Sequence, residues 1–203
     1  VYKRQTQLAV ERLEEFDGKL RQTARDAQTG ASFAQMLGAE FGEDPAQLWG
    51  QLVGPVVQLA GESSVGSGVV LRSRKARFGD GYETFLLTAW HVVRDIQASP
   101  DARDMPVPVA FYAPDGATRE YESTLLAWDA DVDIALLVLD TREKVELGAT
   151  LEAPDNVARI QAFDRIVAVG CPLGNDPIPT RGEVVLTRHR VDGVRYWMIN
   201  APT

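Results

Sequence analysis

The sequence predicts a mainly β protein with two barrels, the second of them incomplete, behind a helical N-terminal extension. Two observations predict this fold class. From Gly54 onward the chain is a succession of short apolar runs, each bounded by Gly, Pro, Asp or Ser, with almost no helical periodicity. Over residues 1–50, by contrast, apolar residues recur at the spacing of a helix face. Many short strands separated by turn signals are typical of small β-barrels.

The N-terminal extension, residues 1–50, carries two series of residues spaced seven apart, which form a stripe along one helix face. The two series are Tyr2, Ala9, Phe16 and Thr23, and Thr6, Leu13, Leu20 and Ala27. Half of these positions are Thr or Ala, so the stripe would make a weak coiled-coil seam. We therefore expect a helix packed on the neighbouring domain through Leu13, Phe16 and Leu20, and the alternative is oligomerisation through it.

The strands lie in residues 51–203. We expect a first barrel over 51–152 and a partial second barrel over 153–203, divided by a hinge-like segment at 151–156. The expected strands are 56–59, 68–71, 84–87, 107–112 and 134–139 in the first barrel, and 166–169, 183–186 and 194–199 in the second.

Composition excludes several classes of function. The net charge of −8 argues against nucleic acid as a partner, because phosphate binding needs a basic surface. One cysteine excludes an internal disulfide framework and a cysteine-rich zinc site, and two histidines leave little for a histidine-built metal centre. No apolar stretch is long enough to be read as a membrane-spanning helix.

Four short segments stand out because of the residue types that they combine. In chain order they are Gly66-Ser67-Gly68, Thr88-Ala89-Trp90-His91-Val92-Val93, Asp133-Ile134-Ala135-Leu136 and Gly170-Cys171-Pro172-Leu173-Gly174. With these segments in this order, residues 54–203 resemble the trypsin-like serine peptidases, and most closely their HtrA-type branch. Each motif alone would be weak, but four in the same order are hard to obtain by chance.

The resemblance selects His91 and Asp133 as catalytic residues. A serine hydroxyl is a poor nucleophile near neutral pH and needs an imidazole to accept its proton. A carboxylate on the other ring nitrogen holds the imidazole in one tautomer. His91 is expected where a strand ends in a short turn, and Asp133 where a buried strand begins and its carboxylate is desolvated.

Other residues could be read as parts of a site. Asp129 and Asp131 are close enough to compete with Asp133, and the alternation of the three suggests a calcium loop; the calcium reading fails because Ile134 stands where such a loop needs Gly. Ser67 lacks the glycines of a nucleophile turn at 65 and 69, which are both Val. Cys171 is expected to be a small buried residue. His189 is expected on the surface or on an edge strand.

The family's nucleophile lies in a Gly-x-Ser-Gly turn that follows a strand, and Tyr196 to Thr203 is expected to be that strand. The serine, the oxyanion hole and most of the specificity pocket are therefore expected beyond Thr203. The resemblance then implies a serine endopeptidase that acts through an acyl-enzyme on polypeptide substrates, without a metal or organic cofactor. It also implies an extracytoplasmic location, a homo-oligomer and a peptide-binding domain C-terminal to this sequence. The alternative, from another class, is a catalytically inactive binding or scaffold module with the same fold.

Overall fold

The computed structural model describes residues 44–62, 64–98, 105–191 and 193–202. The chain divides into two compact units, Val1–Ala46 and Gln47–Thr203. The expected contact residues of the N-terminal extension, Leu13, Phe16 and Leu20, lie outside the described residues. The described part opens with a short helix, α3 (Pro45–Leu48), and a π-helical turn, η1 (Trp49–Val53).

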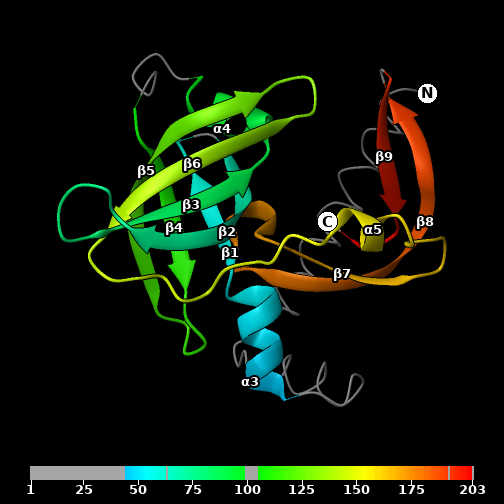
Figure 1. Cartoon of the computed structure of the whole chain (residues 1–203), viewed down its shortest axis with the longest axis horizontal. Helices are drawn as coiled ribbons and strands as arrows, with labels where there is room; N and C mark the ends of the chain where they lie inside the picture. The colour runs from blue at the N-terminus through cyan, green and yellow to red at the C-terminus, as the bar shows by residue number, and fades with distance from the viewer. Residues whose placement is uncertain (1–43, 63, 99–104, 192, 203) are drawn as a thin grey trace, which may run out of the picture. The chain divides into compact units, whose positions relative to one another are not determined.

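Six antiparallel strands form a closed barrel in the order β1-β2-β3-β6-β5-β4 (Figure 1). They are β1 (Val56–Ala60), β2 (Val65–Lys75), β3 (Tyr82–Thr88), β4 (Val107–Tyr112), β5 (Thr118–Asp129) and β6 (Ile134–Thr141). Closure of the barrel comes from the pairing of β1 with both β2 and β4, which leaves no free edge.

The barrel core comes from the side chains that alternate inward along these strands. Leu59, Leu86 and Leu137 are fully buried, and the helix α4 (Trp90–Ile96) adds Val92, Val93 and Ile96 to the same apolar cluster. Burying one such side chain contributes about 1.5–3 kcal/mol. Helix α4 is therefore held to the barrel by its own apolar residues.

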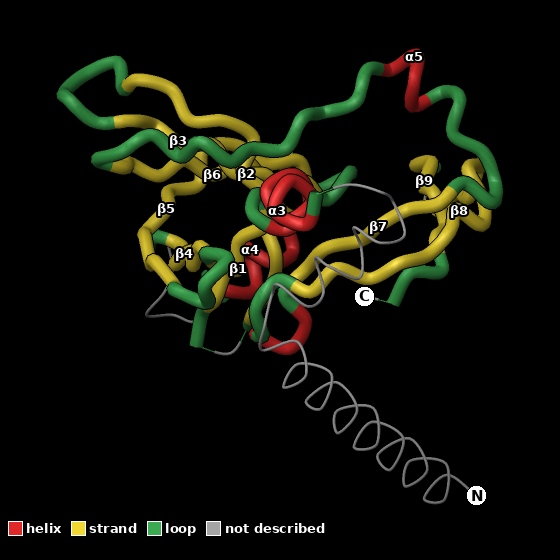
Figure 2. The backbone as a smooth tube through the Cα atoms, turned by 90° about the horizontal axis from the view of Figure 1, so that it is seen from below, coloured by secondary structure: helices red, strands yellow, loops and turns green. Residues whose placement is uncertain are grey.

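Three further strands form a separate sheet in the order β7-β8-β9 (Figure 2). They are β7 (Arg165–Gly170), β8 (Ile178–Val191) and β9 (Val194–Ile199). The first part of β8, from Ile178 to Glu183, pairs with β7, and its second part, from Val184 to Val191, pairs with β9. The short helix α5 (Pro154–Val157) precedes this sheet, and a 3₁₀ turn, η3 (Pro172–Gly174), follows β7.

The mainly β class is confirmed, and two local expectations are wrong. Strand β5 was not expected, because its first half is mostly polar and Ser123 is its only buried residue, although Leu125 to Trp128 form a short apolar run. His91 lies in helix α4, where the sequence predicted a short turn. None of the described helices is both long enough and apolar enough to cross a membrane.

Candidate active site

His91 is the second residue of helix α4. Strand β3 ends at Thr88, Ala89 is extended (φ −77°, ψ 142°), and the helix begins at Trp90. Because Val92 and Val93 are buried directly after it, the backbone of His91 has little freedom to move. Its side chain is 53% exposed and therefore remains accessible.

Asp133 is the last residue of the turn between β5 and β6, and its backbone is left-handed (φ 55°). Aspartate tolerates this region better than most residues. Its carboxylate holds His91 twice: Oδ1 accepts the backbone N–H of His91 at 2.8 Å, and Oδ2 lies 2.6 Å from the ring Nδ1. Its carbonyl also accepts the N–H of Trp90 at 3.3 Å. The structure thus brings together the two residues that the sequence singled out, His91 and Asp133.

Two opposing effects act on the Asp133 carboxyl. Its partial burial raises the pKa, and the hydrogen bonds from the His91 ring and backbone lower it by more, so that the pKa lies below its usual value. The side chain is nevertheless 43% exposed, so the desolvation that the sequence predicted is partial. The Asp133 carboxylate therefore comes from the turn between β5 and β6 and not from strand β6 itself.

The tautomer of His91 follows from this arrangement. An ionised carboxylate only accepts hydrogen bonds, so Nδ1 carries the proton and the lone pair is on Nε2. Nε2 makes no hydrogen bond within the part of the chain that the structure describes. An oriented imidazole with a free Nε2 is able to take a proton from a hydroxyl nucleophile and return it to a leaving group.

Neither Asp129 nor Asp131 takes the place of Asp133 beside the His91 ring. Asp129 Oδ1 accepts the N–H groups of Asp131 and Val132 at 2.9 and 3.3 Å, so this residue shapes the turn that places Asp133. Within the described ranges no three His, Cys, Asp or Glu side chains are grouped so that they could hold a metal ion.

Ser67, Cys171 and His189 all lie outside the pair formed by His91 and Asp133. The Ser67 hydroxyl accepts the N–H of Cys171 at 2.8 Å. Cys171 is buried, as expected; burial raises the pKa of its thiol to about 11, against a smaller lowering by Ser67. His189 lies in β8 opposite Tyr196, in the part of that strand that pairs with β9.

An aromatic pair beside His91 was missed by the sequence analysis. Trp90 stacks on Trp128 of β5 with ring centroids 5.2 Å apart, and Trp128 is 58% exposed. Finding this pair from the sequence would have required predicting a strand over 118–129, because that strand brings Trp128 next to the helix that contains His91.

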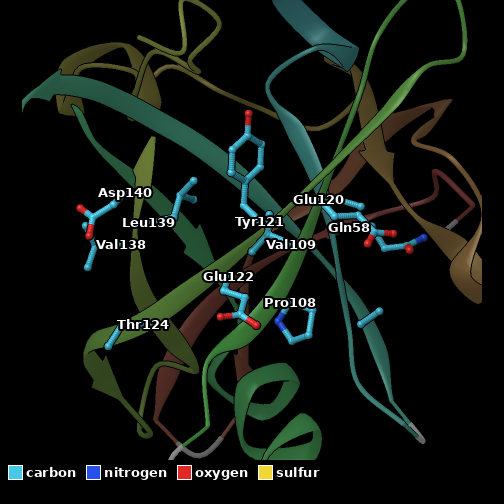
Figure 3. A pocket seen from close by; sticks show the side chains of 12 residues that line it. Gln58, Pro108, Val109, Glu120, Tyr121, Glu122, Thr124, Val138, Leu139 and Asp140 are labelled. Atoms are coloured by element: carbon cyan, nitrogen blue, oxygen red, sulfur yellow. The ribbon is translucent and has the colours of Figure 1, made fainter. Parts of the chain in front are cut away.

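A hollow of about 610 Å³ lies elsewhere on the barrel, over β1, β4, β5 and β6 (Figure 3). Glu120, Glu122 and Asp140 are among the residues that line it, and His91 and Asp133 are not. The hollow is therefore separate from the candidate active site.

Comparisons with known proteins identify the family and the fold. The family model described as a trypsin-like peptidase domain matches residues 66–202, which include His91 and Asp133. Among solved structures, the crystal structure of Deg5 is similar with a TM-score of 0.60 and 19% sequence identity, over 78% of this chain and 73% of that one. At this identity the similarity concerns the fold. A search of curated proteins finds no significant match.

Proposed function

The chain belongs to the family of trypsin-like peptidase domains, and on this premise we propose that it is part of a serine endopeptidase in which His91 is the general base and Asp133 orients it. The observation that carries the proposal is that the Asp133 carboxylate makes two hydrogen bonds to His91. Oδ2 lies 2.6 Å from the ring Nδ1, and Oδ1 accepts the backbone N–H at 2.8 Å. The order of the four motifs supports the HtrA-type branch.

The proposed reaction is peptide-bond hydrolysis through an acyl-enzyme. His91 Nε2 takes the proton of a serine hydroxyl as the oxygen attacks the peptide carbonyl, and then gives that proton to the leaving amine. Asp133 keeps Nδ1 protonated throughout and stabilises the imidazolium that forms between the two transfers. The nucleophilic serine is proposed to follow Thr203, in the Gly-x-Ser-Gly turn that the resemblance implies. The Ser67 hydroxyl instead accepts the N–H of Cys171.

The partners expected from the resemblance remain part of this proposal. They are polypeptide substrates, a homo-oligomeric state and a C-terminal peptide-binding domain. An extracytoplasmic location likewise stays a prediction.

A covalent probe tests the function. A polypeptide that continues past Thr203 is treated with a fluorophosphonate, which labels only a serine activated by a base. Wild type should be labelled, His91→Ala should lose labelling, and Asp133→Asn should lower the rate by about 10⁴-fold because it favours the wrong imidazole tautomer. His189→Ala is the matched control and should label like wild type.

Two results contradict the proposal. One is a folded polypeptide that resists the probe and has no Gly-x-Ser-Gly turn after Thr203, which establishes the inactive binding module instead. The other is labelling that survives His91→Ala unchanged.

A further inference from the structure

The end of β2 and the turn that follows it have a charge opposite to that of the whole protein. Four of the chain's 21 Lys and Arg residues fall between positions 72 and 77, whereas the net charge of the chain is −8. These cations are Arg72, Arg74, Lys75 and Arg77. Figure 1 shows the loop that joins β2 to β3 reaching out beyond the barrel strands.

All four cations lie over aromatic rings of the same hairpin. Arg72 and Arg74 lie over Phe85, with 5.7 and 4.8 Å between the guanidinium carbon and the ring centroid. Lys75 Nζ lies 5.0 Å from the centroid of Tyr82. Because a cation stacked on a ring is held in place, the entropy lost on binding an anion is reduced.

Most of this positive charge is not neutralised locally. Arg74 forms an ion pair with Glu83 at 2.7 Å. Lys75 donates to the carbonyl of Asp80, and neither Arg72, Lys75 nor Arg77 forms an ion pair with a carboxylate of the described residues. Three exposed cations are therefore left for an external anion.

The tip of the hairpin adds an apolar group. Phe78 is 85% exposed, more than any other large hydrophobic side chain that the structure describes, and Arg77 lies over its ring at 5.6 Å. Gly79 beside it has a left-handed backbone (φ 86°), which turns the chain sharply at this point. One aromatic ring at the tip with basic residues behind it is the composition of a membrane-surface anchor.

The exposed ring and the charge of the hairpin favour a bilayer over an acidic polypeptide or a nucleic acid. Phe78 is 85% exposed, and a bilayer interface offers its ring an apolar environment that an acidic peptide does not. A nucleic acid would continue past the hairpin over the acidic remainder of the protein, whereas a planar surface is touched by the tip alone. The rings of Phe85 and Tyr82 are also covered by cations and are not free to stack on bases.

We infer that the β2–β3 hairpin binds the surface of an anionic lipid bilayer, with Arg72, Lys75 and Arg77 on the lipid phosphates and Phe78 in the interface. The site is separate from His91 and Asp133, and the inference does not depend on peptidase activity. Binding is weak by this hairpin alone and falls as salt is raised, because the attraction acts only within a Debye length.

Sedimentation of the full chain with lipid vesicles tests whether the hairpin binds an anionic bilayer. The protein should sediment with vesicles of phosphatidylcholine and phosphatidylglycerol and not with pure phosphatidylcholine. Each of Arg72→Gln, Lys75→Gln and Arg77→Gln should lower the partition coefficient about fivefold, which corresponds to about 1 kcal/mol for each basic residue. Phe78→Ser should lower it without changing the salt dependence.

The matched control removes the same charge from another hairpin. The triple variant Arg188→Gln, Arg190→Gln and Arg195→Gln, on β8 and β9, should bind like wild type. Its counterpart is the triple variant that combines Arg72→Gln, Lys75→Gln and Arg77→Gln. The inference is overturned if wild type does not bind the anionic vesicles, or if the control triple variant weakens binding as much as this counterpart. It is also overturned if a single-stranded oligonucleotide or an acidic peptide binds the hairpin while the vesicles do not. Circular dichroism of each variant confirms that it is folded.

Discussion

The hydroxyl of Ser67 accepts the backbone N–H of Cys171 at 2.8 Å and so joins the barrel to the turn that follows β7. The carbonyl of the same Ser67 accepts the hydroxyl of Thr88 at 2.8 Å, at the end of the strand that leads to His91. A second bond, from Gln58 Nε2 to the carbonyl of Asn175 at 3.0 Å, holds the same turn. Two side chains of the barrel therefore tie the turn after β7 to the strands beside the candidate active site.

Ser67→Ala should lower the free energy of unfolding by about 1–1.5 kcal/mol, because a partly buried N–H loses its acceptor. The specific effect is expected at Cys171, whose amide should exchange with solvent faster. Urea denaturation gives the first quantity and hydrogen exchange the second.

Ser73→Ala is the control for this change. It removes a hydroxyl from the same strand, one that accepts a bond from Thr84 at 2.9 Å. It should lower stability and leave the exchange of the Cys171 amide at its wild-type level, relative to neighbouring amides. Equal effects of the two variants at Cys171 would contradict the proposed link.

Gly66 allows β2 and the His91 helix to approach each other. A Cβ at this position would lie 2.5 Å from Val92 Cγ1 and 2.6 Å from Cγ2. Gly66→Ala should therefore destabilise the protein by about 1–3 kcal/mol through overpacking. In a Val92→Ala background the same substitution should cost clearly less, since the nearest remaining side-chain atom, Val92 Cβ, is 3.1 Å away. Urea denaturation of wild type, the two single variants and the double variant measures this coupling. Strictly additive changes in the free energy of unfolding would show that Gly66 and Val92 are not coupled.

The strands that the sequence predicts are those with an apolar run bounded by turn residues, including β7 and β9, in which no residue is fully buried. Strands β1, β3, β4 and β6 each carry alternating buried residues and were expected within a few residues of their observed bounds. Strand β5 has only Ser123 fully buried and its first half is mostly polar, so the short apolar run from Leu125 to Trp128 did not by itself indicate a strand of 12 residues. Pairing with β4 and β6, which no local pattern encodes, makes it a strand.

The candidate site likewise has features with a local sequence signal and features without one. The motifs led to His91 and Asp133, and their spacing of 42 residues is bridged by the pairing of β3 with β6. The exposure of the Asp133 carboxylate was not predictable, because it depends on a left-handed residue at the end of a turn. The link from Ser67 to Cys171 joins residues 104 apart in the chain and has no local signal either.

The thiol of Cys171 should react slowly in the folded protein. Burial raises its pKa to about 11, and the residue is 4% exposed. Since the thiolate is the reactive form, little of it is present near neutral pH. Dithionitrobenzoate should therefore modify the native protein at least about a hundred times more slowly than the urea-unfolded protein at pH 8. Equal rates in the native and the unfolded protein would show that the contact between the barrel and the turn after β7 opens readily.

The hydrogen bonds from His91 make stability depend on the charge of Asp133. Burial raises the pKa of this carboxyl and the hydrogen bonds from His91 lower it by more, so the pKa in the folded protein lies below its ordinary value of 3.8. A lowered pKa means that the unfolded chain binds a proton first as pH falls. The stabilisation is thus fully present above about pH 4 and is lost as pH falls through the pKa of the folded state.

Asp133→Asn removes this dependence while keeping a side chain that tolerates the left-handed backbone. In urea denaturation, the free energy of unfolding of wild type should exceed that of Asp133→Asn near neutral pH, and the gap should close as pH falls below about 4. Asp131→Asn, which removes a carboxylate from the same turn, is the control and should follow wild type at every pH. A gap that stays constant from neutral to acidic pH would show that the bonds from His91 do not require the ionised carboxylate, and the assignment of the Nδ1 proton would then be wrong.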